Sequence, residues 1–186
     1  MPKVHRIKIE PMTEESFRPF GELMDAVERP PDHRQFSPID FQADGITTVS
    51  VIWQPYQGLT FTQLERHFAV TQSFIQLAGS PAVVAAALPT DPSDPKAIPN
   101  PDQVRAFLID STKGFAFKKG TWHSLDRYIL SPPGATFVIL NSRPNPTQIA
   151  DYEKGFGLTY TDLDSDQNPT KVDFGERLGI TFEVVL

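Results

Sequence analysis

From Gly45 onward the chain is a succession of short runs of β-branched and aromatic residues separated by turn residues. Such runs are typical of strands in an all-β domain. Seven runs are predicted to be strands: Thr47–Trp53, Thr71–Leu77, Ala82–Leu88, Val104–Asp110, Gly114–Phe117, Ala135–Asn141 and Ile180–Val185. Short strands that close on themselves as a sandwich or small barrel leave an interior pocket. The pattern therefore predicts an all-β fold with room for a site inside it.

The N-terminal part predicts one more strand and one short helix. Apolar and polar residues alternate over Lys3–Glu10, which favours a half-buried strand at the edge of a sheet. Thr13 is a good N-cap, with two glutamates in the first helical turn. Pro19 and Gly21 limit this helix to a turn or two. The proline-containing segment Val27–Asp44 is expected to cross over the mouth of the barrel.

Two later regions interrupt the series of strands. Pro89–Pro101 has five prolines in thirteen positions, so it cannot supply a central strand and is predicted to be an exposed loop. Asp151–Glu176 is mixed in character and rich in glycine. Its aromatic residues are expected to anchor it by packing: Tyr152, Phe156, Tyr160 and Phe174.

Composition narrows the class of protein. A chain of 186 residues with 39% hydrophobic content is enough for a single domain, residues 1–186, around one core. Its net charge of −6 without a basic cluster argues against nucleic acid or a membrane surface as a partner. It has no cysteine and therefore no disulfide or thiol nucleophile. Since no long apolar run or apolar leader is present, we expect a cytoplasmic protein.

Candidate chemistry is concentrated in the stretch FTQLERHFAVTQSFIQLAG, residues 61–79. Glu65 and His67 are two residues apart, which on an extended strand places both side chains on one face. A carboxylate beside an imidazole suits a metal site or an acid/base pair. The alternative is a partly exposed strand with a salt-bridging Glu-Arg-His trio. A second stretch, GFAFKKGTWH, ends in His123.

The spacing of these residues resembles the two motifs of the cupin superfamily, H-x-H-x(3,4)-E-x6-G and P-x-G-x2-H. In the first motif the two histidines, the glutamate and the glycine correspond to Glu65, His67, Gln72 and Gly79. In the second motif the proline, the glycine and the histidine correspond to Lys118, Gly120 and His123. The resemblance implies a cupin-like antiparallel β-barrel or jelly roll with a short N-terminal helix.

At a finer level the chain resembles the ureidoglycolate lyase family. The segments that carry this likeness lie between Ser16 and Leu140: SFRPFGELM, LERH, TQSF with its following glycine, VRAFLI and KKGTWH. Short bacterial members have a second histidine after the matching WH, whereas Ser124–Arg127 follows here. The resemblance implies a carbon–nitrogen lyase that splits ureidoglycolate into glyoxylate and urea in purine and allantoin catabolism.

The resemblance also implies roles for individual residues. His67, His123 and Glu65 are expected to be catalytic, with either His123 or Glu65 as the base. Arg105, Gln72 and Trp122 are expected to bind the substrate, with Arg105 on its carboxylate. A divalent metal ion of unknown identity could be held by Glu65, His67, Gln72 and His123. Arg105 could instead form an ion pair with a surface carboxylate, and Trp122 could be a core residue. Lys119 and Asp126 are expected to be exposed to solvent.

Three other functions stay open from the sequence. They are another cupin enzyme acting on a small hydroxy or keto acid, a hydrolase that releases ammonia, and a non-catalytic cupin that binds a small molecule. In each case the partner is a small molecule, and a homodimer is expected. The strands at both termini, predicted to be sheet edges, would provide its pairing surface.

Overall fold

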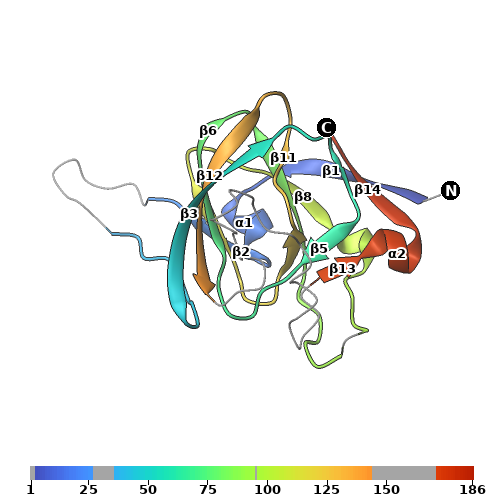
Figure 1. Ribbon diagram of the computed structural model, residues 1–186, viewed down its shortest axis with the longest axis horizontal. Helices are drawn as coiled ribbons and strands as arrows, with labels where there is room; N and C mark the ends of the chain where they lie inside the picture. The colour runs from blue at the N-terminus through green and yellow to red at the C-terminus, as the bar shows by residue number, and fades with distance from the viewer. Residues whose placement is uncertain (1–2, 27–35, 95, 144–170) are drawn as a thin grey trace, which may run out of the picture.

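The computed structural model describes residues 3–26, 36–94, 96–143 and 171–186 (Figure 1). One sheet has the strand order β13 (Lys171–Asp173), β5 (Gln63–Glu65), β10 (Trp122–Ser124), β7 (Ala82–Ala87), β8 (Arg105–Leu108), β1 (Lys3–Pro11), β14 (Ile180–Val185) and β4 (Thr60–Phe61). In addition, β11 (Tyr128–Ile129) pairs with β7. The second sheet has the order β2 (Gly21–Met24), β9 (Gly114–Phe117), β6 (Ser73–Gly79), β12 (Gly134–Arg143) and β3 (Ile46–Pro55).

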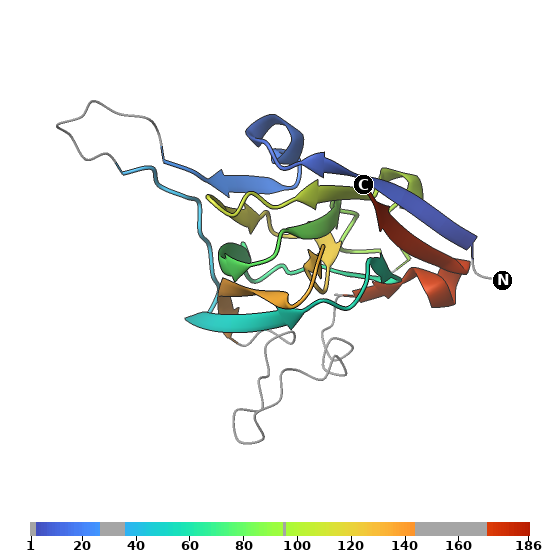
Figure 2. The ribbon, with the colours of Figure 1, turned by 90° about the horizontal axis from the view of Figure 1, so that it is seen from above.

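The two sheets curl around a common interior as a half-barrel (Figures 1 and 2). The described helices are short: α1 (Glu14–Phe17), α2 (Phe174–Leu178) and the 3-10 turn η1 (Pro101–Gln103). The expected all-β, cupin-like fold is thus confirmed. Among the described residues no helix is long and apolar enough to cross a bilayer.

All seven strands predicted from Gly45 onward are present, and their ends differ from the prediction by at most two residues. The strands that the pattern missed have two to four residues each: β2, β4, β5, β10, β11 and β13. So few residues show no periodicity, and these strands are defined by the partners with which they pair. Two of them, β5 and β10, carry candidate site residues.

The N-terminal strand is not at an edge, and this part of the prediction was wrong. β1 pairs in parallel with β14 along Lys3–Lys8 and with β8 along Ile9–Pro11. Both terminal strands therefore lie inside the sheet, side by side (Figure 1). Alternation of buried and exposed residues along β1 shows that the two faces of its sheet differ. It does not show whether the strand lies at an edge of the sheet.

The short helix is confirmed at the predicted place. The Thr13 side chain accepts a hydrogen bond from the backbone N–H of Ser16, and the Ser16 hydroxyl accepts one from the backbone N–H of Thr13. This reciprocal capping box satisfies the first amides of the helix. Phe17, at its end, is fully buried against Phe107 and Phe115. The helix thus closes one side of the interior.

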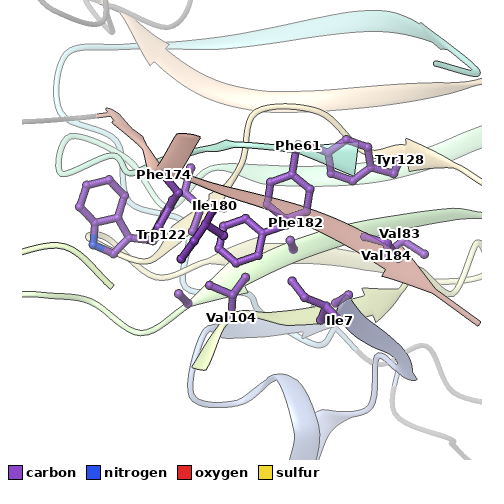
Figure 3. Packing of buried hydrophobic residues seen from close by; sticks show 14 of the residues in the cluster. Ile7, Phe61, Val83, Val104, Trp122, Tyr128, Phe174, Ile180, Phe182 and Val184 are labelled. Carbon is purple, nitrogen blue, oxygen red and sulfur yellow. The ribbon is translucent and has the colours of Figure 1, made fainter. Parts of the chain in front are cut away.

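The larger sheet is covered on both faces, as β7 shows. Its alternate residues Ala82, Val84 and Ala86 contact the phenylalanines between the two sheets. The others, Val83, Ala85 and Ala87, belong to a second cluster under α2 and β14. In that cluster the Phe61 ring stacks on Tyr128 and on Phe182, with centroids 5.0 Å apart in each case (Figure 3). A strand buried on both faces is apolar throughout.

The irregular segments follow the sequence in part. Pro89–Pro101 is a mostly exposed loop, as predicted. Phe174 is fully buried and acts as the expected anchor, whereas the other three predicted anchors, Tyr152, Phe156 and Tyr160, lie outside the described residues. Of the expected crossing segment, residues 27–35 also lie outside them. Ala43, at its end, forms a bridge with Val70.

Candidate active site

Glu65 and His123 face each other across a strand pair. β5 and β10 are antiparallel, and Glu65 is the direct partner of His123. His123 in turn pairs with Ala86 on β7. Direct partners in a ladder point to the same face of the sheet. Since Ala86 contacts the inner cluster, Glu65 and His123 project into the interior between the sheets.

His67 reaches the same place by a different route. β5 ends at Glu65, so Glu65 and His67 do not lie on one extended strand, although their spacing had suggested that they would. The carbonyl of His67 accepts a hydrogen bond of 2.7 Å from the backbone N–H of Gly120. This bond ties the chain after β5 to the turn before β10. The His67 side chain thereby lies in the interior beside His123, although 56 residues separate the two histidines in the sequence.

The three side chains form a compact buried cluster. Glu65, His67 and His123 are 5%, 5% and 1% exposed. Glu65 Oε1 lies 3.6 Å from His67 Nε2 and 3.9 Å from His123 Nδ1, and the two imidazole centroids are 5.1 Å apart. These separations are too long for hydrogen bonds. One ligating atom from each residue lies within 4.8 Å of the others, in the one such group among the described residues.

The environment of His123 favours a neutral ring. Burial lowers the pKa of His123 well below its ordinary value of 6.5, and the neighbouring His67 and Arg127 lower it further. The ring stacks on Phe117 with centroids 4.4 Å apart. Nδ1 lies 3.2 Å from the carbonyl oxygen of Ser124, which can only accept a hydrogen bond. Nδ1 therefore carries the proton, and Nε2 keeps a lone pair for a proton or a metal ion.

Three buried polar atoms of this region have no hydrogen-bond partner in the described part of the chain. They are His67 Nε2, His123 Nε2 and Gln72 Oε1. Gln72 adjoins the cluster through its backbone, because its carbonyl accepts a hydrogen bond of 2.9 Å from the N–H of Phe117, the residue that stacks on His123. Two imidazoles and one carboxylate form a ligand set that a divalent cation accepts. Of the four residues expected to hold a metal, Glu65, His67 and His123 thus fit one.

Arg105 is already paired with a carboxylate. It projects from the same face of the sheet as His123, since both pair with Ala86. Its guanidinium donates to Glu10 through Nε, at 2.6 Å, and through Nη2, and also to the Ser16 carbonyl, at 3.1 Å. Its side chain is 37% exposed. The structure shows the ion pair that was the alternative for this residue.

Trp122 lies on the face of β10 opposite to His123, because successive side chains of a strand alternate. It belongs to the second cluster, where its Nε1 donates to Thr90 Oγ1 at 3.0 Å. Its ring contacts the fully buried Arg66 guanidinium at 4.4 Å, and Arg66 also donates to Thr90. The substrate-binding role expected for Trp122 has no support in this arrangement. Trp122 instead joins Arg66 and Thr90 behind the site.

The remaining charged residues near the site differ in how exposed they are to solvent. Lys119 forms a partly exposed ion pair with Asp44 at 3.2 Å, in line with its expected solvent exposure. Asp126 accepts a hydrogen bond of 2.9 Å from Gln54. Arg127 is buried, and its Nε donates to Gln54 Oε1 at 2.8 Å.

Gln54 is a residue that the sequence reading missed. The signal was available, since alternation along β3 exposes Val49, Val51 and Trp53 and turns Gln54 inward. A polar residue at an inward position of a strand needs a partner inside the barrel. Arg66 and Thr90 had no comparable signal, because their meeting depends on the path of the proline-rich loop.

Comparisons with known proteins point to one family. The model of the family described as ureidoglycolate lyase matches residues 4–155. A ureidoglycolate lyase of Rhodobacter capsulatus is 31% identical over 144 residues, which cover 71% of this chain and 82% of that protein. One of Azotobacter vinelandii is 29% identical over 129 residues, covering 63% and 74% of the two chains. One of Pseudomonas aeruginosa is 30% identical over 132 residues, covering 63% and 73%.

Proposed function

Because this chain belongs to the ureidoglycolate lyase family, we propose that it cleaves the carbon–nitrogen bond of ureidoglycolate, with Glu65, His67 and His123 as its catalytic residues. The observation that supports these roles is the buried cluster of one carboxylate and two imidazoles inside the barrel. The products are glyoxylate and urea, and the reaction is a step of purine and allantoin catabolism. The protein acts in the cytoplasm.

The reaction needs a base and an acid but no covalent nucleophile. The central carbon of ureidoglycolate carries a hydroxyl, a carboxylate and the ureido nitrogen. Removal of the hydroxyl proton lets the oxygen form a carbonyl group while the carbon–nitrogen bond breaks. The electron pair of that bond stays on the nitrogen, which takes up a proton and leaves as urea. One group must therefore accept a proton and another must donate one.

His123 and Glu65 are the candidates for the base. The pKa of His123 is lowered, chiefly by burial, so its Nε2 has a free lone pair near neutral pH. Glu65 lies near both imidazoles and can take the proton itself or stabilise an imidazolium. His67 is the donor to the leaving nitrogen. Low solvent exposure of all three keeps water from competing for these protons.

A divalent cation would be held by Glu65, His67 and His123, with the Gln72 side-chain oxygen as a fourth donor. When bound, such an ion would lower the pKa of the substrate hydroxyl. The protein residues still orient the substrate and provide the proton donor. The carboxylate of Glu65 also offsets the positive charge of the ion.

Incubation of the purified protein with racemic ureidoglycolate, with and without a chelator, tests the function. Urea and glyoxylate should appear in equal amounts, with at least half of the racemate left if one enantiomer is the substrate. Release of ammonia without urea would indicate a hydrolase instead. Absence of turnover, even after divalent metal ions are added back, would refute the lyase assignment. A chelator-sensitive rate would indicate that the Glu65, His67 and His123 group holds a metal.

We further propose that the protein is a homodimer, with a surface different from the one expected. The terminal strands are a poor pairing surface, because each has two neighbours in the sheet: β1 pairs with β14 along Lys3–Lys8 and with β8 along Ile9–Pro11, and β14 also pairs with β4. β3 pairs with β12 alone among the described strands and exposes Val49, Val51 and Trp53. Apart from Arg143, no residue of β3, β6 or β12 is charged. An exposed apolar face of this kind favours burial against a second copy.

A further inference from the structure

Gln72 has a fixed backbone and an unused side-chain oxygen. Its carbonyl accepts a hydrogen bond of 2.9 Å from the N–H of Phe117. The preceding residue, Thr71, donates its N–H to the Gln42 carbonyl at 2.9 Å, and its Oγ1 accepts from the Gln42 N–H at 2.8 Å. Gln72 is 5% exposed, yet its Oε1 has no hydrogen-bond partner in the described part of the chain. A buried acceptor without a donor is uncommon in folded proteins, and a ligand with an N–H or O–H group would supply the donor.

The register of the smaller sheet directs the Gln72 side chain toward the catalytic cluster. Ser73, the next residue, pairs with Ala116 in the antiparallel β6–β9 ladder. The position before that pair sets Gln72 opposite Phe117, in agreement with the hydrogen bond between their backbones. Directly opposed residues project to the same face, with their Cβ atoms about 5 Å apart. Since the Phe117 ring stacks on the His123 ring with centroids 4.4 Å apart, Gln72 points into the interior beside His123.

The groups of the proposed substrate differ in what they can offer to this oxygen. The carboxylate only accepts hydrogen bonds, and the hydroxyl gives its proton to the base. The ureido group remains, and its terminal carboxamide carries N–H donors next to a carbonyl acceptor. The side chain of glutamine is itself a carboxamide, so the two groups can pair through two hydrogen bonds. One runs from the ureido N–H to Gln72 Oε1 and the other from Gln72 Nε2 to the ureido oxygen.

The second of these hydrogen bonds would also assist the reaction. As the carbon–nitrogen bond breaks, its electron pair goes to the nitrogen, and the ureido carbonyl group delocalises it onto the oxygen. An N–H donor on that oxygen stabilises the developing negative charge until the nitrogen is protonated. The glutamate that the cupin motif has in the place of Gln72 would instead repel this charge. An amide at this position therefore suits a substrate with a ureido leaving group.

We propose that Gln72 binds the terminal carboxamide of the ureido group through this pair of hydrogen bonds and so determines the specificity of the site. This inference rests on the proposed function for the identity of the substrate. It defines the ligands of the site more generally as small carboxylic acids that carry a ureido group. The amide oxygen has two lone pairs, so the pairing leaves one of them for a cation.

Two unreactive analogues that differ in one group test the proposal by calorimetry. Ureidoacetate lacks the hydroxyl and is not cleaved, and N-acetylglycine has a methyl group in place of the terminal amino group. The wild-type protein should bind ureidoacetate at least about tenfold more tightly, because N-acetylglycine leaves Gln72 Oε1 without a donor. Gln72→Met, which keeps the length of the side chain but not its amide, should lose this preference. Absence of the preference in the wild type, or its persistence in Gln72→Met, would overturn the proposal.

Gln76→Met is the matched control. Gln76 is also a buried glutamine of β6, and it lies four residues, or about 13 Å, further along the strand. Its Nε2 donates to the Ser80 carbonyl at 2.9 Å, and it lines a different cavity. Gln76→Met should keep the wild-type preference for ureidoacetate. Loss of the preference in Gln76→Met as well as in Gln72→Met would overturn a specific role of Gln72.

Gln72→Glu separates recognition of the substrate from a role in metal binding alone. A carboxylate binds divalent cations better than an amide does, so a residue that served only as a metal donor should keep turnover in this variant. If Gln72 binds the ureido group, the variant loses the N–H donor, and kcat/KM for ureidoglycolate should fall about a hundredfold with divalent metal ions added. Turnover at the wild-type level would overturn the proposal.

A measurement on the wild-type protein covers the case in which the Gln72 variants do not fold. The side-chain NH2 signals of glutamines can be followed by NMR and assigned through bonds from the backbone. Ureidoacetate should shift the signals of Gln72 and leave those of Gln76 in place. No shift at Gln72 at saturating ureidoacetate would overturn the proposal, even if ureidoglycolate is cleaved and the proposed function stands. If ureidoacetate binds at Gln72 but ureidoglycolate is not cleaved, the proposed function fails and the carboxamide site stands.

Discussion

At the scale of single residues, Glu65 is the centre of the site. Its Oε1 lies close to both imidazoles, 3.6 Å from His67 Nε2 and 3.9 Å from His123 Nδ1. A carboxylate with so little exposure needs partners that offset the cost of burying its charge. The two histidines, and a cation when present, provide them. If His67 and His123 are catalytic, their replacement should therefore lower activity more than it lowers stability.

Replacement of either histidine should separate these two effects. His67→Ala and His123→Ala should each lower kcat by about a hundredfold or more, the usual scale for loss of a general acid, a base or a metal ligand. The midpoint of urea unfolding should change much less. His5→Ala, which removes a histidine outside the cluster, is the control and should retain full turnover. Near-normal turnover per folded molecule in both site variants would contradict the catalytic roles.

His123 should also make the metal-free protein sensitive to acid. Because its pKa in the folded protein is lowered by burial, the unfolded chain binds a proton below about pH 6.5 that the folded chain does not. The free energy of unfolding should then fall as the pH decreases from 6.5. Urea titrations in the presence of chelator should show a shallower loss over this range for His123→Gln. Equal slopes for the variant and the wild type would show that His123 does not titrate in this way.

At the scale of elements, the site depends on two three-residue strands. β5 and β10 are too short to hold their register by their own ladder hydrogen bonds. Behind them, Arg66 and Trp122 are in cation–π contact at 4.4 Å, and both donate to the Thr90 hydroxyl. This contact joins the residue after Glu65 to the residue before His123. The loop residue Thr90 thereby stabilises the alignment of the catalytic pair.

Thr90→Val should show this support. Valine has nearly the same shape but cannot accept the hydrogen bonds of Arg66 and Trp122, so the free energy of unfolding should fall by about 1–3 kcal/mol. Turnover should fall as well, because Glu65 and His123 lose a common anchor. Thr90→Ser keeps the hydroxyl and serves as the control in urea unfolding. If both variants had the stability of the wild type, the hydroxyl would have no structural role.

The second helix gives a separate prediction at this scale. Asp173 caps α2, since its Oδ1 accepts a hydrogen bond of 3.1 Å from the backbone N–H of Glu176, and its Oδ2 binds the Gln63 side chain at 2.7 Å. Asp173→Ala should destabilise the protein by about 1 kcal/mol, as loss of an N-cap usually does. Asp173→Asn, which can still accept the capping bond, should recover much of this loss in thermal unfolding. If Asp173→Asn lost as much stability as Asp173→Ala, the effect would come from the charge of Asp173 and not from the capping hydrogen bond.

At the scale of the whole molecule, the two sheets differ in how their outer faces are covered. In the larger sheet, the outer face of β7 packs against α2 and against β14 of the same curled sheet. The outer face of the smaller sheet exposes apolar residues, among them Val49, Val51, Trp53 and Leu77. In Figure 2, β3 forms one side of the molecule, away from α1. The homodimer that we propose would bury this face.

A charge on the exposed face should disrupt the dimer. Val51 is 66% exposed, so Val51→Glu should leave the fold intact and convert a dimer into a monomer in light scattering coupled to size-exclusion chromatography. Val4→Glu places the same charge on the exposed part of β1 and should leave the dimer unchanged. The reverse result would place the interface at the terminal strands. A monomeric wild-type protein would exclude the dimer altogether.

Local sequence patterns were sufficient to predict the fold class, most strands and the residues that could take part in catalysis or binding. Runs of β-branched residues are local patterns, so Thr47–Trp53 or Ile180–Val185 can be recognised without knowledge of their partners. The likeness to two motifs singled out Glu65, His67, Gln72 and His123. The same local patterns misjudged β1, because the number of neighbours of a strand is a property of the sheet.

Only the tertiary structure decided which of these residues meet. The register of β5 against β10 brings Glu65 opposite His123, and a turn after β5 brings back His67. The ion pair of Arg105 with Glu10 spans 95 residues, and the hydrogen bond from Arg127 to Gln54 spans 73. Contacts over such separations depend on how the sheets close, and no short stretch of sequence specifies them. For that reason the residue type was predictable at Arg105 and Arg127, but the partner of each arginine was not.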